Sequence, residues 1–386
     1  MQAQAGRLDC SIVRSAIDVA SALRRLRVLG DVSCFLKDRE SVRSYVEEAI
    51  DRDLPEDRLR YEELTYKLLG LVPREFDYRK GVVALYTREI GGYYDPIKRV
   101  YSMASWLPEN LQMPVAVHEL THALQDQHFD LRKMMDEKSS TGDTLLARSA
   151  LIEGDATIVM LDYDRTKSGK RTVAEEYSVA DIMMEHLAES MLSEAVGDAP
   201  PALHRLLIFP YVSGLRFVHY LLQHGGYQSV NRAFIRPPTS TREILHPQFY
   251  LDKAPPLPPV EPAPIKGTIN VSKPTYTDQL GEFVVSVLLS NWVSPLRASN
   301  ASAGWTGDTV AIYDIPKRDV QALTWKSSWT DERNAREFSH ALAEAYSQRF
   351  KKEPMPGKNT AFFGGTEVGD VQIARENTEV VVTVLP

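Results

Sequence analysis

The chain has 386 residues, of which 43% are hydrophobic and 25% charged, and its formal net charge is −7. This length exceeds what a single hydrophobic core usually serves, so we expect two or three packed units. The composition is typical of a soluble globular protein. No block of lysine or arginine is present that would follow a phosphate backbone, which argues against a nucleic-acid partner.

Apolar runs are too short for a membrane span, which needs roughly 18 to 20 residues. The longest, residues 203–222, is interrupted by Pro210, Gly214 and Arg216. The first residues lack the basic and apolar regions of a signal peptide, although Ala3-Gln4-Ala5 resembles the small-residue pattern at a cleavage site. We therefore expect an exported protein, periplasmic, envelope-associated or secreted, whose signal peptide has been removed. A cytoplasmic protein is the alternative.

The two cysteines, Cys10 and Cys34, are too few for a tetrahedral cysteine site or a disulfide framework. They allow one disulfide in an oxidising compartment, or two separate thiols. The sequence leaves both possibilities open.

The predicted elements begin with two or three helices between residues 12 and 69, where apolar residues recur at helical spacing. These form a helical N-terminal segment, residues 1–76. From Gly81 the pattern changes to short strand-like runs at residues 82–86 and 100–103. Between them, the glycines and the Asp-Pro pair of residues 91–96 predict turns.

Helices are then expected at residues 112–127, 144–163, 173–195 and 202–224. A proline-rich stretch, residues 237–264, ends this second unit, residues 77–262. The third unit, residues 263–386, is expected to hold a helix at 279–292, strands at 309–315 and 320–328, a helix at 331–349 and a hairpin around 376–378. The fold class is therefore α+β. The third unit has no cluster of titratable residues, so we expect it to pack, shape the substrate site or bind.

The run His118-Glu119-Leu120-Thr121-His122 lies in the helix expected at residues 112–127. Residues four apart share one face of a helix, so both imidazoles can reach one zinc ion while Glu119 lies beside it. The apolar flanks predict a half-buried helix. Burying two histidines and a carboxylate is costly unless a charged group such as a dication pairs with them.

A catalytic zinc usually has a third protein ligand. Glu153 is the first candidate, because its predicted helix is rich in core-facing apolar residues, and Gly154 would let another helix approach closely. An ion pair of Glu153 with Arg148 or Arg165 is the competing interpretation. His128 ranks next as a ligand, and Glu137, in a charged stretch, ranks lower.

His-Glu-x-x-His followed by a helical glutamate resembles the gluzincin metallopeptidases. The longer strings at residues 117–129 and 153–156, and those at 92–96, 209–214 and 237–241, are similar to a group of largely uncharacterised bacterial predicted metallopeptidases. The resemblance covers residues 40–250 well and the C-terminal unit loosely. It implies a zincin-like catalytic core, with a zinc cleft between a small mixed sheet and a helical lobe.

The resemblance further implies hydrolysis of peptide bonds, with Glu119 as the base. It implies that the strand near residues 100–103 is the sheet edge that pairs with an extended substrate. A histidine or tyrosine is expected to stabilise the oxyanion. Tyr211 and His246 are the better candidates, and Tyr94 and Tyr250 are the others.

A histidine ligand also needs an acceptor for its other ring nitrogen. Thermolysin-like enzymes place an aspartate four residues after the ligand glutamate, but here that position is Thr157. Asp155 and Asp126 are the candidates for this role instead.

Two further functions stay open. The site could serve a zinc hydrolase of a non-peptide amide, although no cysteine or third histidine lies where such sites would need one. The chain could instead be a non-catalytic envelope binding or scaffold protein on a peptidase-like fold. The intact Glu119 argues against the latter, because a structural site does not need a base.

Overall fold

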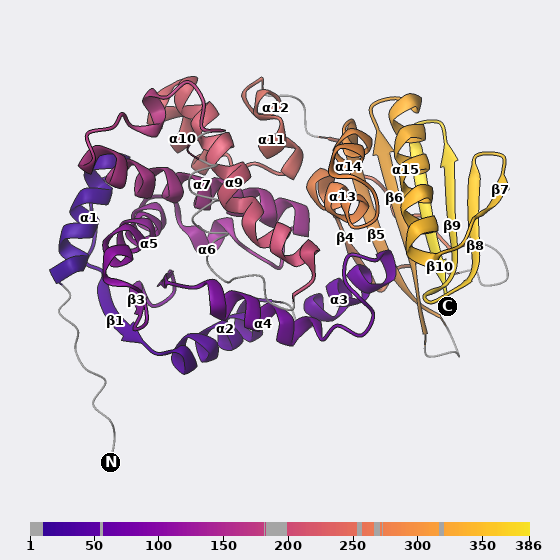
Figure 1. The fold of residues 1–386 in the computed structure, drawn as a ribbon, viewed down its shortest axis with the longest axis horizontal. Helices are drawn as coiled ribbons and strands as arrows, with labels where there is room; N and C mark the ends of the chain where they lie inside the picture. Colours follow the sequence, from indigo (N-terminus) through magenta and orange to yellow (C-terminus); the bar gives the residue numbers. More distant parts are fainter. Residues whose placement is uncertain are drawn as a thin grey trace, which may run out of the picture.

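The computed structural model describes residues 11–54, 57–180, 182, 199–252, 257–265, 271, 273–315 and 320–386. Within them the chain is a mixed α+β protein with two sheets, as the sequence predicts. Figure 1 shows the small sheet among the helices of the N-terminal two thirds and the large sheet at the opposite end of the molecule.

The N-terminal quarter is mainly helical. Its elements are α1 (Ser11–Arg24), β1 (Ser33–Lys37), α2 (Arg39–Asp53), α3 (Arg58–Leu69) and α4 (Tyr78–Glu89). Asp38 and Asp77 cap α2 and α4 by accepting backbone hydrogen bonds from Ser41 and Lys80. The strand expected at residues 82–86 is wrong, because this stretch lies inside α4. Val83 is buried against protein, whereas Val82, Leu85 and Tyr86 line a cavity.

The small sheet adds β2 (Gly92–Asp95) and β3 (Val100–Ala104) to β1 in the order β1-β3-β2. β1 pairs with β3 in parallel and β2 pairs with β3 antiparallel. The turn expected across residues 91–96 is therefore partly wrong, since Gly92–Asp95 forms a strand. The edge expected near residues 100–103 is also wrong, because β3 is the central strand and β2 is an edge.

Mostly helical elements follow in the chain. They are α5 (Glu109–Phe129), α6 (Leu131–Met134), α7 (Gly142–Lys167), η1 (Val173–Glu175), α9 (Pro201–Gln223), α10 (Gly226–Ile235), α11 (Thr241–Leu245) and α12 (Pro247–Leu251). The helix expected at residues 173–195 begins only as the short η1, and residues 183–195 lie outside the described part. α7 and α9 cross at Gly154 and Gly214, where a Cβ on Gly154 would lie 2.2 Å from the backbone carbon of Gly214.

The C-terminal part is a sheet in the order β4-β5-β6-β10-β9-β8-β7 with helices packed against it. Its elements are β4 (Tyr276–Asp278), α13 (Gly281–Ser290), α14 (Pro295–Ser302), β5 (Trp305–Ile315), β6 (Val320–Trp329), α15 (Glu332–Phe350), β7 (Met355–Gly357), β8 (Thr360–Thr366), β9 (Gly369–Glu376) and β10 (Glu379–Leu385). α15 lies along one face of the sheet (Figure 1). Trp325 and Phe338 are fully buried where α15 meets the sheet.

Cys34 in β1 forms a disulfide. The other cysteine of the sequence, Cys10, lies outside the described residues. None of the helices in the described ranges has the length and apolar character needed to cross a bilayer.

Candidate metal centre

α5 carries the His-Glu-x-x-His run on a face that is turned into the protein. His118 and His122 are 8% and 9% exposed, and the neighbouring Val117, Leu120 and Thr121 are fully buried. The two Nε2 atoms lie 3.1 Å apart and the rings are nearly perpendicular. The helix therefore directs both imidazoles to one point, as the four-residue spacing predicts.

Glu153 on α7 completes the group. Its Oε2 lies 3.1 Å from Nε2 of His118 and 3.4 Å from Nε2 of His122. The competing interpretation does not hold, because Arg148 donates to the Met134 carbonyl and the Ser140 hydroxyl, and Arg165 pairs with Glu176. One donor atom from each of the three residues lies within 4.8 Å of the others, so these residues could hold a metal ion.

The charges of this group stabilise one another. Burial by itself lowers the pKa of His122, but attraction to Glu153 outweighs it and raises the pKa to about 9. Burial by itself raises the pKa of Glu153, yet His122 and His118 hold it well below its usual range. The carboxylate is therefore ionised at neutral pH, which is the form that binds a cation.

Glu119 lies on the same helix beside the two histidines. Its Oε2 accepts a hydrogen bond of 2.9 Å from the backbone nitrogen of Tyr94, so the edge strand β2 fixes its position. Burial raises the pKa of Glu119 above its usual range. A half-desolvated carboxylate held next to a metal site is suited to accept and pass on a proton.

Gln125 contacts His122 where the sequence predicts an aspartate. Its Oε1 lies 2.9 Å from Nδ1 of His122, and its Nε2 donates to the Ile152 carbonyl and to Asp155. Asp155 therefore reaches the histidine through Gln125, and it also forms a fully buried ion pair of 2.7 Å with Arg24 of α1. Gln125 is uncharged, so the only sequence feature that indicates its contact with His122 is its position about one helical turn later.

Asp126 contacts Tyr94 and the start of α6 rather than a histidine of the cluster. Its carboxylate accepts hydrogen bonds from the Tyr94 hydroxyl at 3.0 Å and from the backbone nitrogen of Leu131. It is thus a bridge between α5, β2 and the start of α6. The prediction that Asp126 orients a ligand histidine is wrong for this reason.

Tyr211 lies at the cluster, as expected of a donor to the substrate. Its ring centroid is 6.2 Å from that of His118, and its hydroxyl forms a hydrogen bond with Glu153. The nearby charge of Glu153 raises the pKa of Tyr211 well above its usual value. The side chain is still 41% exposed, so an incoming molecule can reach it.

The other predicted donors are engaged elsewhere. His246 forms an ion pair of 2.8 Å with Glu282 of α13 and a ring contact with Phe249, which places it at the junction of α11 and α12. The Tyr250 hydroxyl donates to the Arg236 carbonyl, and that of Tyr94 to Asp126. His246 was predicted from its place before a proline, a pattern that carries no information about Glu282, 36 residues away.

The lower-ranked ligands are also absent from the cluster. The Nε2 atom of His128 lies 2.8 Å from the Arg27 carbonyl, and Glu137 pairs with Arg58. Both side chains therefore connect the N-terminal segment to the region between α5 and α7.

Comparison with known proteins gives a match for one part of the chain. Residues 270–386 match the family described as "Domain of unknown function (DUF8575)". The match covers less than half of the chain and leaves out the residues of the metal centre. No curated protein and no solved structure matches the chain.

Proposed function

We propose that this protein is a zinc metallopeptidase of the gluzincin type, in which His118, His122 and Glu153 hold the metal. The observation that carries the proposal is the spacing of the three donor atoms. Two ligands at about 2.0 to 2.1 Å from a tetrahedral zinc lie roughly 3.3 Å from each other. The distances between the donor atoms are 3.1, 3.1 and 3.4 Å.

The type of donor also fits zinc. Two imidazole nitrogens and one carboxylate oxygen are the ligand set of several catalytic zinc sites, which leave one coordination position open. A zinc ion supplies Lewis-acid chemistry, because it lowers the pKa of a water and polarises a carbonyl group. Zinc fits better than calcium or magnesium, which prefer oxygen ligands.

The chain's own residues then perform proton transfer and positioning. Glu119 accepts a proton from the attacking water, whose oxygen bonds to the carbonyl carbon of the peptide. The carbon–nitrogen bond breaks, and Glu119 returns the proton to the leaving amine. The Tyr211 hydroxyl is placed to donate a hydrogen bond to the carbonyl oxygen as negative charge develops there.

The edge strand β2 offers a place for an extended peptide. Gly92–Asp95 pairs with β3 on one side only, and Tyr94 presents its backbone nitrogen to Glu119 on the other. An added strand along this edge would pass next to the base. This favours a peptide over a compact non-peptide amide as the substrate.

The disulfide at Cys34 supports a location outside the cytoplasm, because such bonds persist in oxidising compartments. We therefore keep export as part of the proposal. No described residue specifically supports the alternative of a binding or scaffold protein. Glu119, in contrast, has a defined role in the catalytic function.

The test compares the parent with Glu119→Gln, a change that keeps the hydrogen bond from Tyr94 possible. We expect both proteins to bind one zinc ion, measured by elemental analysis after loading and dialysis. Only the parent should cleave an unfolded protein substrate, with a loss in the variant of at least about 10²-fold. A parent that takes up no zinc, or a variant that cleaves equally well, would reject the proposal.

A further inference from the structure

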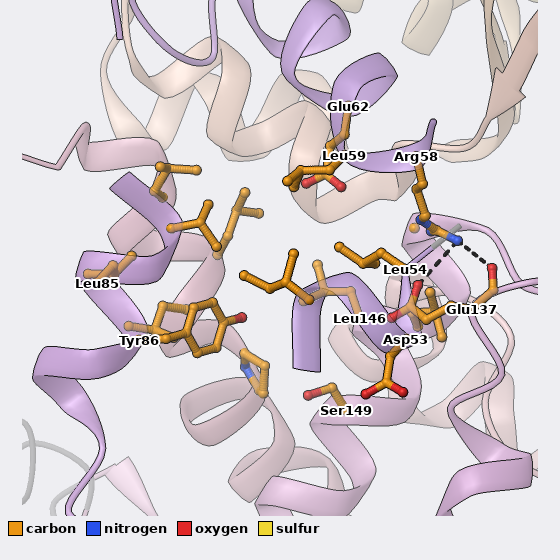
Figure 2. Close-up of a pocket in the computed structure, with 18 of the residues that line it drawn as sticks. Asp53, Leu54, Arg58, Leu59, Glu62, Leu85, Tyr86, Glu137, Leu146 and Ser149 are labelled. Carbon is orange, nitrogen blue, oxygen red and sulfur yellow. Dashed lines mark hydrogen bonds and ion pairs between the residues drawn. The ribbon is translucent and has the colours of Figure 1, made fainter. Parts of the chain in front are cut away.

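A cavity of about 520 Å³ adjoins the metal centre, within the range of ligand-binding cavities. Glu153 and Tyr211 are part of its wall, so it opens beside the proposed zinc ligand. The rest of the wall comes from α2, α3, α4, α7, α9, β4, α13 and adjoining loops and is mostly leucine, valine and tyrosine. Figure 2 shows leucines of three of these helices, Leu59, Leu85 and Leu146, around the cavity.

Tyr86 of α4 lines the same cavity as Glu153, Glu62 and Glu137. Desolvation raises its pKa to about 12, and the negative charges of Glu62, Glu153 and Glu137 add to this effect. The proposed zinc ligand and the charged residues around Arg58 therefore lie on the wall of one cavity.

The charged group consists of Glu62, Glu137 and Asp278 around one cation, Arg58. Arg58 pairs with Glu137 at 3.3 Å and with Asp278 at 3.7 Å, and it donates to the carbonyls of Glu137 and Ser140. Figure 2 shows the Arg58 guanidinium directed to Glu137, away from Glu62. Two carboxylates, those of Glu137 and Asp278, therefore pair with the one guanidinium.

Glu62 lacks a cationic partner. Within the described part of the chain it forms no ion pair, and it accepts a hydrogen bond from the Tyr78 hydroxyl instead. Burial raises its pKa, and the nearby Asp278 adds to the rise. Burial also raises the pKa of Glu137 to about 7, and Glu62 and Asp278 contribute. Carboxyl groups therefore outnumber cations around the cavity, because among its described lining residues Arg58 is the one cation and it is already paired.

We propose that this cavity binds a substrate side chain with a long aliphatic part and a positively charged end, lysine or arginine, and that Glu62 is the partner of that charge. The inference rests on the proposed peptidase function. The methylene groups would lie along the leucines and tyrosines, as the stems of lysine and arginine do on apolar surfaces. The ammonium or guanidinium would meet Glu62, so acidic side chains are rejected by charge repulsion.

The experiment uses the full chain with Glu119→Gln, so that peptides stay intact. Blocked tripeptides Ala-X-Ala, with X as lysine, norleucine or glutamate, are titrated by calorimetry. Norleucine has the same aliphatic chain as lysine without the ammonium group. We expect the lysine peptide to bind about tenfold more tightly than the norleucine peptide, and the glutamate peptide more weakly than both.

The matched variants are Glu62→Gln and Glu63→Gln in the same background. Glu63 is the next residue of α3, pairs with Lys67 at 2.6 Å and does not line the cavity. Glu62→Gln should reduce the lysine preference to less than about threefold, and Glu63→Gln should keep it. If circular dichroism shows that Glu62→Gln does not fold, the inference is tested by the Glu119→Gln protein alone, from its preference for the lysine peptide over the norleucine peptide.

Equal or tighter binding of the norleucine peptide overturns the inference, and so does an unchanged preference in a folded Glu62→Gln variant. Cleavage assays of the parent separate this outcome from failure of the proposed function. Cleavage without a preference for lysine or arginine would leave the peptidase function standing. Selective binding without any cleavage would instead reject the peptidase function and keep a cation-selective cavity.

Discussion

Gln125 determines which nitrogen of His122 is free to bind a metal. The Gln125 Nε2 donates to two acceptors, the Ile152 carbonyl and the Asp155 carboxylate, so its Oε1 must be the atom that faces His122. The Nδ1 of His122 then carries the proton and donates to Gln125. Without a metal, attraction to Glu153 favours a second proton on His122, and a metal at Nε2, the atom near Glu153, would take the place of that proton.

Replacing Gln125 by leucine should therefore weaken metal binding. His122 would lose its acceptor, and both its tautomer and its ring orientation would no longer be fixed. We expect the zinc affinity to fall by about 10- to 100-fold, as measured by competition with a chromophoric chelator. The measurement is made at a temperature where circular dichroism shows the variant folded.

Gln127→Leu provides the control from the same helix. The Gln127 side chain accepts from the backbone nitrogen of Leu29 and donates to the Gly30 carbonyl, both outside the metal centre. Its loss should change stability but leave the zinc affinity within about threefold. An equal loss of affinity in both variants would mean that Gln125 acts only through the stability of α5.

The site residues that could be predicted from the sequence are those that carry a charge or a fixed spacing. His118, His122 and Glu153 belong to this kind, because desolvating them needs a partner and the helical period places them. Gln125 carries no charge, and its partner Asp155 is 30 residues away. The mistaken placement of Asp126 and His246 has the same origin, since long-range pairing decides where each side chain points.

At the scale of elements, the crossing of α7 and α9 lies next to Glu153, the proposed third ligand. Gly154 follows Glu153 in α7, and Gly214 lies one turn after Tyr211 in α9. Each glycine faces the backbone of the other helix, and a Cβ on Gly214 would lie 2.0 Å from the Ala150 carbonyl oxygen. The two helices approach closely only because both positions lack a side chain.

Gly154→Ala should therefore destabilise the protein, although alanine is the better helix former. The methyl group would meet backbone rather than a flexible side chain, so the helices must separate. We expect a loss of about 1 to 3 kcal/mol in the free energy of unfolding, measured with urea. Zinc affinity should fall as well, because Glu153 and Tyr211 adjoin the crossing.

Gly30→Ala is the corresponding control, since a Cβ at Gly30 would have nothing within 4 Å. Its stability should stay within about 0.5 kcal/mol of the parent. A Gly154→Ala variant as stable as the parent would show that the crossing tolerates separation, contrary to the close packing of the two backbones.

The helices α9 and α15 could be predicted because each keeps an apolar face over several turns, whereas α5 and α7 are recognised by long runs of residues that are buried on several sides. The errors concern short segments. Residues 82–86 look like a strand, but they belong to a helix, and Val82, Leu85 and Tyr86 among them line the cavity. Gly92–Asp95 looks like a turn, but it is a strand in which Tyr101 and Val115 leave little room for a side chain at Gly92. The parallel pairing of β1 with β3 joins residues 67 positions apart, a contact that local patterns do not contain.

On the scale of the whole molecule, the N-terminal segment and the C-terminal sheet share a core. Leu69 and Leu71 at the end of α3 pack in the same apolar cluster as Trp325 and Phe338. The Tyr346 hydroxyl and the Arg349 guanidinium of α15 donate to the carbonyls at the end of α3. The cavity beside the metal centre also includes Tyr276 and Asp278 of β4. The C-terminal part therefore contributes directly to the wall of the proposed substrate site.

Two buried aspartates lie where the α7 region meets this C-terminal part. Asp143 accepts hydrogen bonds from the backbone nitrogen and the hydroxyl of Thr241. Asp308 of β5 accepts from the Trp325 indole and from the backbone nitrogens of Leu280 and Gly281. Burial raises the pKa of each to about 7, and the charge of Asp143 adds to the rise at Asp308.

The pH dependence of stability follows from these raised values. Between about pH 4 and pH 7 the folded protein keeps a proton on Asp308 that the unfolded chain has released, so the folded state is favoured most at the acidic end. The contribution of Asp308 to stability therefore falls as the pH rises through this window and is constant above it.

Asp308→Asn removes the ionisation. The unfolding free energy of the variant relative to the parent should then increase from pH 4.5 to pH 7.5 by on the order of 1 kcal/mol or more, as measured with urea at each pH. Asp314→Asn, at an exposed position of the same strand, should show no such trend. A relative stability of Asp308→Asn that decreases or stays constant over this range would show that the hydrogen bonds to Asp308 outweigh its burial.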